Sequence, residues 1–180
     1  MRKGFTVIEL LVLVTIILLI VFFAVPRLIR MRLQQNEADA LKAVKLIAKA
    51  QQIWQENNYS KLVDQKVEKG YAKDLSILYR QKVEAGDKTS EIKLIPESLA
   101  KATTKDSAGY RGYYFVFDKS SKDDEFKVWG KPIKYGESGK KVFYTNHLLS
   151  RGDKIIVKYT DFNEDIGDAL PEPDAKWIEE

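Results

Sequence analysis

Cysteine is absent from the 180 residues of this chain, and histidine occurs once, as His147. Without cysteine there is no disulfide and no thiol nucleophile, so a folded domain must be stabilised by packing or by a bound metal. His147 lies in an expected turn, where a lone histidine is far more often inert than catalytic. No glycine-rich phosphate loop is present, and residues 109–112 are better explained as the entry to a strand. These absences favour a protein that is not an enzyme.

Glycine is missing between Gly4 and Gly70, and Glu9 is the one charged side chain between Lys3 and Arg27. The apolar run 5–25 holds twenty-one residues, enough at about 1.5 Å rise per residue to cross the roughly 30 Å hydrocarbon core as a helix. It is longer than the apolar region of about 7 to 15 residues in a secretory signal, and no small-residue cleavage site follows it. We therefore expect residues 5–26 to form a membrane helix that the mature protein retains.

Glu9 gives this helix a functional interpretation. A carboxylate within a membrane segment costs about 2.5 to 3.5 kcal/mol on insertion scales, and such a residue usually has a partner. The run itself contains no lysine or arginine. Cleavage of the chain just before the run is one way to supply a cation, because the new α-amino group of Phe5 would lie one helical turn from Glu9.

The N-terminus resembles a known processing signal. Residues 1–4, Met-Arg-Lys-Gly, and residues 5–10, Phe-Thr-Val-Ile-Glu-Leu, resemble the type IV prepilin signal, in which a short basic leader ends in glycine before Phe-Thr-Leu-Ile-Glu-Leu. Only Val7 departs from that pattern. The alternative interpretation is a plain signal anchor with a chance glutamate.

The resemblance implies specific roles. A prepilin peptidase would cut after Gly4 on the cytoplasmic side and methylate the new amino group of Phe5. Glu9 would pair with that amino group, in its own or a neighbouring subunit, as filaments assemble. Pro26 stands where pilins commonly carry a helix-bending proline. The partners implied are the peptidase, other pilin subunits, the inner-membrane assembly platform and, before assembly, the lipid bilayer.

Charge is distributed unevenly along the chain. The formal net charge is +4, but residues 161–180 hold eight acidic side chains against one lysine, which leaves +11 on the rest. A basic body with an acidic tail suggests electrostatic contacts between subunits at least as readily as nucleic-acid binding. The lysines are scattered and the aromatic residues 110–115 are better explained as sheet core, so we expect no nucleic-acid partner.

Basic residues flank both ends of the apolar run. Arg2 and Lys3 precede it, and Arg27, Arg30 and Arg32 follow it. The positive-inside rule therefore does not fix the orientation. A cytoplasmic N-terminus and an exported C-terminal domain follow from the resemblance alone.

Beyond Pro26 the apolar residues narrow to a stripe at helical spacing, formed by Met31, Leu33, Ala40, Leu41, Val44, Ile47, Ala48 and Trp54. Good helix formers dominate this segment. We expect one helix from Phe5 to about Glu56, amphipathic over 27–56. Any bend should fall in the turn before Pro26, because proline lacks an amide hydrogen and crowds the carbonyl four residues back.

The remaining chain predicts an α+β domain. Residues 57–108 form a connector with two short helices, one after an N-cap at Asp74 and one around 96–102. Within 109–160, strands are expected at 110–117, 126–129, 142–145 and 154–159. Their short connections require antiparallel neighbours. A four-stranded sheet would cover the helix stripe, which is the pilin-like arrangement, and 161–180 would remain an acidic C-terminal tail.

A second resemblance lies in the sheet. Residues 129–135, Trp-Gly-Lys-Pro-Ile-Lys-Tyr, with Gly139, look like the Trp-Gly-x-Pro-x-x-Tyr stretch of the major pseudopilins of type II secretion. An acidic segment before Trp177 closes the chain, as theirs does. The usual Asp-Pro before the tryptophan is replaced by Lys127-Val128, and the chain is longer than a typical major pseudopilin.

The acidic tail offers one candidate metal site. Asp161, Asn163, Asp165 and Glu172 imitate the oxygen-ligand spacing of an EF-hand loop. Ile166 stands where that loop needs glycine, and no second helix follows, so a true EF-hand is not expected. A looser calcium site, which the resemblance to calcium-binding major pseudopilins favours, and a solvated acidic tail both stay open.

The sequence thus favours a structural subunit of a type IV pilus-like filament, either a type II secretion pseudopilin or a type IV pilin. Such a subunit would start as a single-pass protein of the bacterial inner membrane and end in a periplasmic or extracellular filament. The rival interpretation is a membrane-anchored periplasmic ligand-binding module, whose helix merely tethers the sheet domain.

Overall fold

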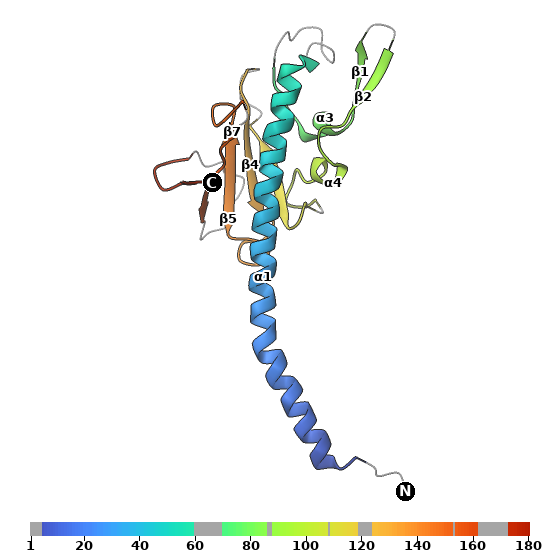
Figure 1. The fold of residues 1–180 in the computed structure, drawn as a ribbon, viewed down its shortest axis with the longest axis vertical. Coiled ribbons are helices and arrows are strands. Elements are labelled where there is room, and N and C mark those ends of the chain that lie inside the picture. Colours follow the sequence, from blue (N-terminus) through green and yellow to red (C-terminus); the bar gives the residue numbers. More distant parts are fainter. Residues whose placement is uncertain are drawn as a thin grey trace.

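One helix, α1 (Val7–Glu56), runs along the length of the molecule and carries all other elements around its C-terminal half (Figure 1). The computed structural model describes residues 5–59, 70–85, 88–107, 109–118, 124–152, 154–161 and 173–180. The helix was expected to begin at Phe5. It begins two residues later because Thr6 is extended (φ −80°, ψ 153°) and serves as its N-cap. Its end at Glu56 is as predicted.

Pro26 lies inside α1 without ending it. Figure 1 shows the axis of α1 curving through the half that contains Pro26, while the half beside the sheet is straighter. The curve agrees with the predicted effect of a proline that cannot donate to the helical hydrogen-bond ladder.

Five antiparallel strands form the main sheet, in the order β3-β4-β5-β8-β9. Their bounds are Tyr113–Phe117 (β3), Lys127–Pro132 (β4), Lys141–Asn146 (β5), Lys158–Asp161 (β8) and Ile178–Glu179 (β9). The α+β class and the antiparallel pairing are as predicted, but the number of strands is not. The chain end returns to the sheet as β9, which pairs Lys158 with Glu179 and Tyr159 with Ile178. Its last residues are therefore part of the fold and not a free tail.

The expected strand 154–159 is also wrong as a single element. Lys154–Ile155 (β7) pairs with Ser150–Arg151 (β6) in a small hairpin, and the next strand, β8, starts only at Lys158. Gly152 permits the hairpin turn with φ +61°, which favours glycine.

The connector contains both predicted helices and one element that was not predicted. Asp74 caps α3 (Leu75–Tyr79) by accepting from the Ser76 amide at 2.8 Å, and α4 spans Glu97–Ala100. Between them, β1 (Gln81–Ala85) and β2 (Lys88–Ile92) form an antiparallel hairpin. Arg80 and Glu91 form an ion pair at its base.

The main core lies between α1 and one face of the sheet. The buried apolar residues of α1 face Phe115, Val128 and Phe143 of the sheet in one cluster; they are Ala40, Ala43, Val44, Ile47, Ala48, Ala50 and Trp54. This confirms the predicted stripe from Ala40 onward, whereas Met31 stays exposed. The opposite face of the sheet carries a second cluster of Trp129, Val142 and Tyr144, against which Trp177 packs.

Candidate functional site

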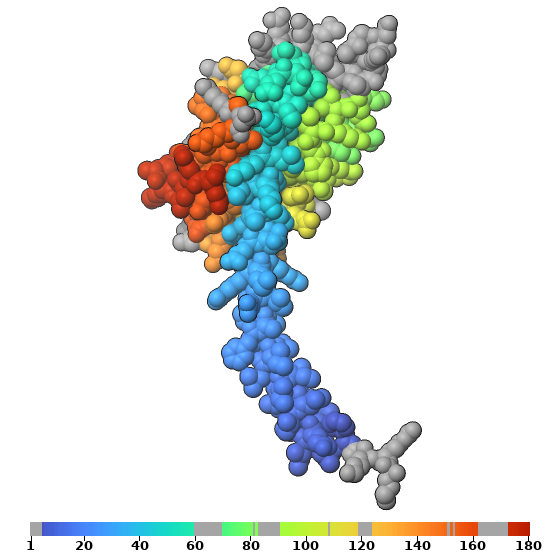
Figure 2. Space-filling model, viewed as in Figure 1, coloured from blue at the N-terminus to red at the C-terminus, as the bar shows by residue number. Residues whose placement is uncertain are grey.

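The N-terminal half of α1 is the most unusual surface of the described chain. Every residue from 5 to 32 is exposed, including Phe5 at 77%, Ile8 at 76% and Phe22 at 74%. Figure 2 shows this half as a narrow stalk that leaves the rest of the molecule. Among the described residues, α1 is the one helix with the length and apolar composition of a single-pass membrane anchor. Apolar surface of this extent is not expected to face water.

Thr6 and Glu9 form a capping box at the first turn of the stalk. The Thr6 amide and hydroxyl donate to Glu9 Oε2 at 2.8 and 2.9 Å, and the Glu9 amide donates to Thr6 Oγ1 at 3.3 Å. The cap holds the carboxylate beside the backbone of Thr6, the residue that follows Phe5. Glu9 therefore lies in the first turn of α1 with its carboxylate bonded to Thr6, and its pairing with the amino group of Phe5 stays a prediction. Gly4, the predicted cleavage point, lies outside the described residues.

The rest of the apolar run has few polar side chains that need a hydrogen-bond partner. The Thr15 hydroxyl donates to the Leu11 carbonyl at 2.8 Å, so it makes its hydrogen bond within the helix. Phe22 and Phe23 contact edge to face, with ring centroids 5.5 Å apart. The run ends at the exposed Arg27 and Arg30, which place positive charge just after Pro26.

Two hydrogen bonds hold α1 where the stalk meets the sheet domain. Asn36 donates to the Ser138 carbonyl at 2.9 Å, and the Lys140 amide donates to Glu37 Oε1 at 3.0 Å. Gly112 lies at the same junction with φ +80°, where a Cβ would be 3.0 Å from Asn36 Nδ2. The turn between β4 and β5 therefore fixes the direction in which the stalk leaves the domain.

The Trp-Gly-x-Pro-x-x-Tyr stretch has a structural role. A Cβ on Gly130 of β4 would lie 3.1 Å from both Phe115 Cε1 and Val44 Cγ2, so glycine allows α1 to approach the sheet closely. A Cβ on Gly139 would clash with the Tyr113 hydroxyl. That hydroxyl donates to the Lys141 carbonyl at 3.0 Å, and burial, with the nearby Glu37 charge, raises the Tyr113 pKa well above its usual range.

The predicted calcium ligands are mostly beyond what the structure describes. Asp161 is exposed at the end of β8, whereas Asn163, Asp165 and Glu172 lie outside the described residues. Within the described ranges, no three histidine or acidic side chains are grouped so as to hold a metal. The calcium site stays a prediction.

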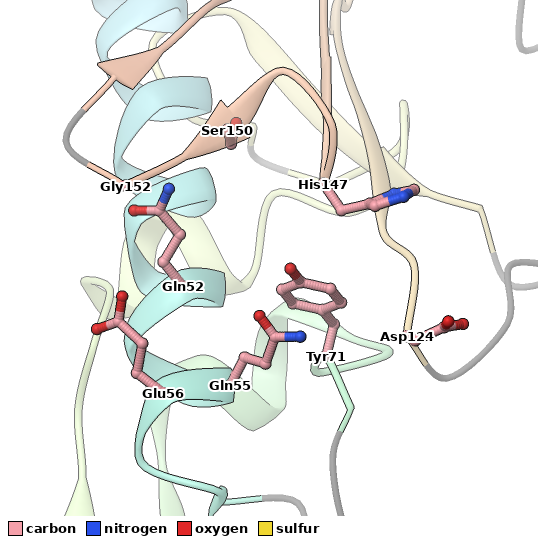
Figure 3. Close-up of a pocket in the computed structure, with 8 residues that line it drawn as sticks. All are labelled: Gln52, Gln55, Glu56, Tyr71, Asp124, His147, Ser150 and Gly152. Carbon is pink, nitrogen blue, oxygen red and sulfur yellow. The ribbon is translucent and has the colours of Figure 1, made fainter.

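Sequence reasoning missed a polar pocket of about 460 Å³ at the C-terminal end of α1. Its described lining residues are Gln52, Gln55, Glu56, Tyr71, Asp124, His147, Ser150 and Gly152. Figure 3 shows the first three rising from the last turns of α1, with the Tyr71 hydroxyl directed toward the space beside them. No periodicity could have revealed this pocket, because its walls come from four separate segments of the chain.

Comparison of the chain with protein-family models, curated proteins and solved structures found no match. Any functional assignment therefore depends on the residues and geometry described above.

Proposed function

We propose that this chain is a structural subunit of a type IV pilus-like filament, either a type II secretion pseudopilin or a type IV pilin, and not an enzyme. The observation that carries the proposal is the stalk. Its side chains are exposed from residue 5 to residue 32, and Glu9 is the one charged side chain between residue 5 and Arg27. A helix of this kind requires either lipid or other apolar helices around it.

The stalk has one environment before assembly and another after it. As a single subunit it spans the bacterial inner membrane, with a cytoplasmic N-terminus and an exported domain. Prepilin peptidase removes residues 1–4 and methylates Phe5. The assembly platform then extracts the subunit, and its stalk packs against those of other subunits to form the filament core.

Glu9 sets the axial position of each incoming subunit. Its carboxylate is buried in an apolar core after assembly, where an unpaired charge is costly. The amino group of Phe5 on a neighbouring stalk neutralises it at one axial offset only. The capping box supports this role, because it holds the carboxylate at the end of the helix that carries the new amino group.

The sheet domain supports the same proposal. A pilin fold places a long helix across an antiparallel sheet, with half of the helix projecting. Here β4 and β5 cover α1 from Ala40 onward, and the hydrogen bonds of Asn36 and Glu37 define where the projection begins.

Mass spectrometry of the N-terminus tests the proposal most directly. Protein recovered from the membrane of a producing cell with a prepilin peptidase should begin at Phe5 and carry one N-methyl group. The same gene expressed in a strain that lacks the peptidase should yield protein beginning at Met1. Identical, uncut N-termini in both strains would refute the filament proposal.

A second candidate function, a membrane-anchored ligand-binding module, is favoured by the polar pocket at the end of α1. Such a module would need the apolar helix only as a tether. It would retain residues 1–4, so the same mass measurement distinguishes the two functions.

A further inference from the structure

Three arginines follow the apolar run of the stalk within six residues. Arg27, Arg30 and Arg32 are all exposed, and none of them makes a hydrogen bond or an ion pair with the part of the chain that the structure describes. On a helix, a charge pairs with residues three or four positions away, and α1 carries no acidic residue between Glu9 and Glu37. The stalk therefore holds three positive charges that its own carboxylates do not neutralise.

The arginines lie at the depth of lipid headgroups when the stalk spans a membrane. From Val7 to Pro26, α1 rises by about 30 Å, which is the thickness of the hydrocarbon core. From Arg27 to Arg32 it rises by about 7.5 Å more, and the polar layer on each side of a bilayer is about 5 to 7.5 Å thick. The guanidinium groups are thus within reach of headgroup phosphates.

Two shallow apolar grooves lead up to these arginines along the surface of the stalk. Phe23 and Arg27 are four positions apart and line both grooves, so they form a ridge between them. Phe22 and Arg30 border the groove on one side of the ridge, and Leu28 borders the groove on the other side. All of these side chains are exposed. An elongated apolar group can therefore lie on either side of the ridge, with a guanidinium near its end.

A phospholipid with two acyl chains and a net negative charge matches this surface. One chain fits each groove, and the phosphate then lies beside Arg27 and Arg30, whose planar forks bind phosphate through paired hydrogen bonds. A zwitterionic lipid brings its own cation, whereas an anionic lipid neutralises the uncompensated arginines. We propose that the stalk binds an anionic phospholipid through these arginines, with its acyl chains on either side of Phe23.

The inference deepens the proposed function and rests on it, because it takes residues 5–26 to span the membrane and the sheet domain to be exported. Cleavage after Gly4 removes Arg2 and Lys3. Basic residues then flank the span only at its exported end, which is the reverse of the usual lysine and arginine bias. An anionic lipid at that end offsets this charge, and extraction of the subunit into a filament has to break the contacts.

Native mass spectrometry of the full, uncut chain tests the proposal. The protein in detergent micelles is mixed with equal amounts of phosphatidylglycerol and phosphatidylcholine that have the same acyl chains, and the bound lipids are identified by mass. We expect about tenfold or more phosphatidylglycerol over phosphatidylcholine, because each basic residue near an anionic headgroup adds to the preference. Glycerol 1-phosphate has the phosphate but no chains, and it should not displace the lipid at the same concentration.

Variants connect the preference to the arginines. Arg27→Gln combined with Arg30→Gln should lower the preference for phosphatidylglycerol by about fivefold or more. The matched control, Lys42→Gln combined with Lys49→Gln, removes two exposed charges from the part of α1 beside the sheet and should leave the preference unchanged. All four side chains are exposed, so both variants should keep the wild-type melting temperature.

Four results would overturn the proposal. The first is equal binding of the two lipids, and the second is an equal loss of preference in the lysine variant, which would indicate a general effect of charge. The third is displacement of the lipid by glycerol 1-phosphate, which would indicate a phosphate site without chain contacts. The fourth is a dimer without lipid, which would assign the arginines to acidic residues of a second copy. None of these readouts depends on N-terminal processing, so failure here is distinguishable from failure of the filament proposal.

Discussion

Gly130→Ala is expected to destabilise the sheet domain, although alanine is ordinarily the better residue in a strand. The added methyl group would lie 3.1 Å from Val44 Cγ2 on the helix and 3.1 Å from Phe115 Cε1 on the neighbouring strand. Both neighbours are buried, at 0% and 1% exposure, and belong to the main core. Neither can move into solvent, so the helix and the sheet must separate slightly.

The two opposing effects can be compared. Overpacking a core costs about 1 to 3 kcal/mol, whereas replacing glycine within a strand by alanine gains about 0.5 to 1 kcal/mol. The net loss is then about 0 to 2.5 kcal/mol, with a midpoint of about 1 kcal/mol. At about 2 to 4 °C per kcal/mol for a domain of this size, the midpoint corresponds to a fall in melting temperature of roughly 2 to 5 °C and the upper limit to a fall of about 10 °C. Tryptophan fluorescence of the full chain in detergent micelles, followed on heating, measures this shift.

A double variant distinguishes the proposed contact between residue 130 and Val44 from a general effect of alanine on the stability of β4. Val44→Ala removes the methyl group that the new Cβ would meet, although it is itself destabilising because it leaves a cavity. The Gly130→Ala penalty should therefore be smaller in the Val44→Ala background than in the wild type, by about 0.5 kcal/mol or more. A higher melting temperature for Gly130→Ala than for the wild type, or strictly additive effects in the double variant, would refute the close approach of α1 to β4.

Four further predictions address the processing signal, the stalk, the sheet edge and the acidic segment. Gly4→Ser should block cleavage and leave uncut protein in the membrane, since a hydroxymethyl group would not fit a subsite shaped for glycine; recovery of trimmed protein on a gel would remove the prepilin assignment. Glu9→Val should enter the membrane at least as well as the wild type but yield fewer filaments in shear fractions. Glu9→Gln, which keeps an acceptor for Thr6, should assemble equally poorly if charge pairing is what matters, and normal assembly would favour a role in helix capping alone. Trp177→Ala should lower the melting temperature and speed amide exchange at Glu180, whose amide donates to the Val157 carbonyl at 2.9 Å; unchanged exchange would show that β9 does not need the tryptophan. Millimolar calcium should raise the melting temperature by several degrees relative to EDTA, and Asp161→Ala combined with Asp165→Ala should abolish the gain, whereas identical curves in calcium and EDTA would leave a solvated acidic segment.

The sequence predicted correctly those helices and strands that depend on residues close together in the chain. The helical spacing from Ala40 to Trp54 predicted the buried face of α1, and Asp74 marked the start of α3, because stripes and caps depend on residues three to four positions apart. The strands β3, β4 and β5 were recognisable from aromatic and β-branched residues.

The elements that were missed depend on distant partners. Ile178 and Glu179 are too few to show an alternating pattern, and they form β9 only because β8 offers an unpaired edge. The hairpin of β1 and β2 has few apolar residues, so its sequence lacks the alternating apolar pattern that predicts a strand. The break between β7 and β8 follows from the pairing of Lys154 with Arg151 rather than from composition.

The candidate sites show the same difference between features set by neighbouring residues and features set by distant ones. The roles of Glu9 and Phe5 are predictions from a contiguous motif, and the structure adds that Glu9 closes a capping box with Thr6. The pocket beside Gln52 could not be predicted, because its walls meet only once residue 72 has folded back against the helix.

The order in which the sheet is completed follows from the place of β9, which comes after the other four strands of the sheet in the sequence. During synthesis the stripe of α1 is made first, and the first strand that covers it, β3, starts about 60 residues after Trp54. At about 5 to 20 residues per second, the ribosome takes roughly 3 to 12 s to supply that strand. The sheet is not complete until β9 has been synthesised and has paired with β8. Until the strands cover it, the apolar face of α1 is available to other nascent chains, so the synthesis of the sheet is the period when this protein is most exposed to aggregation.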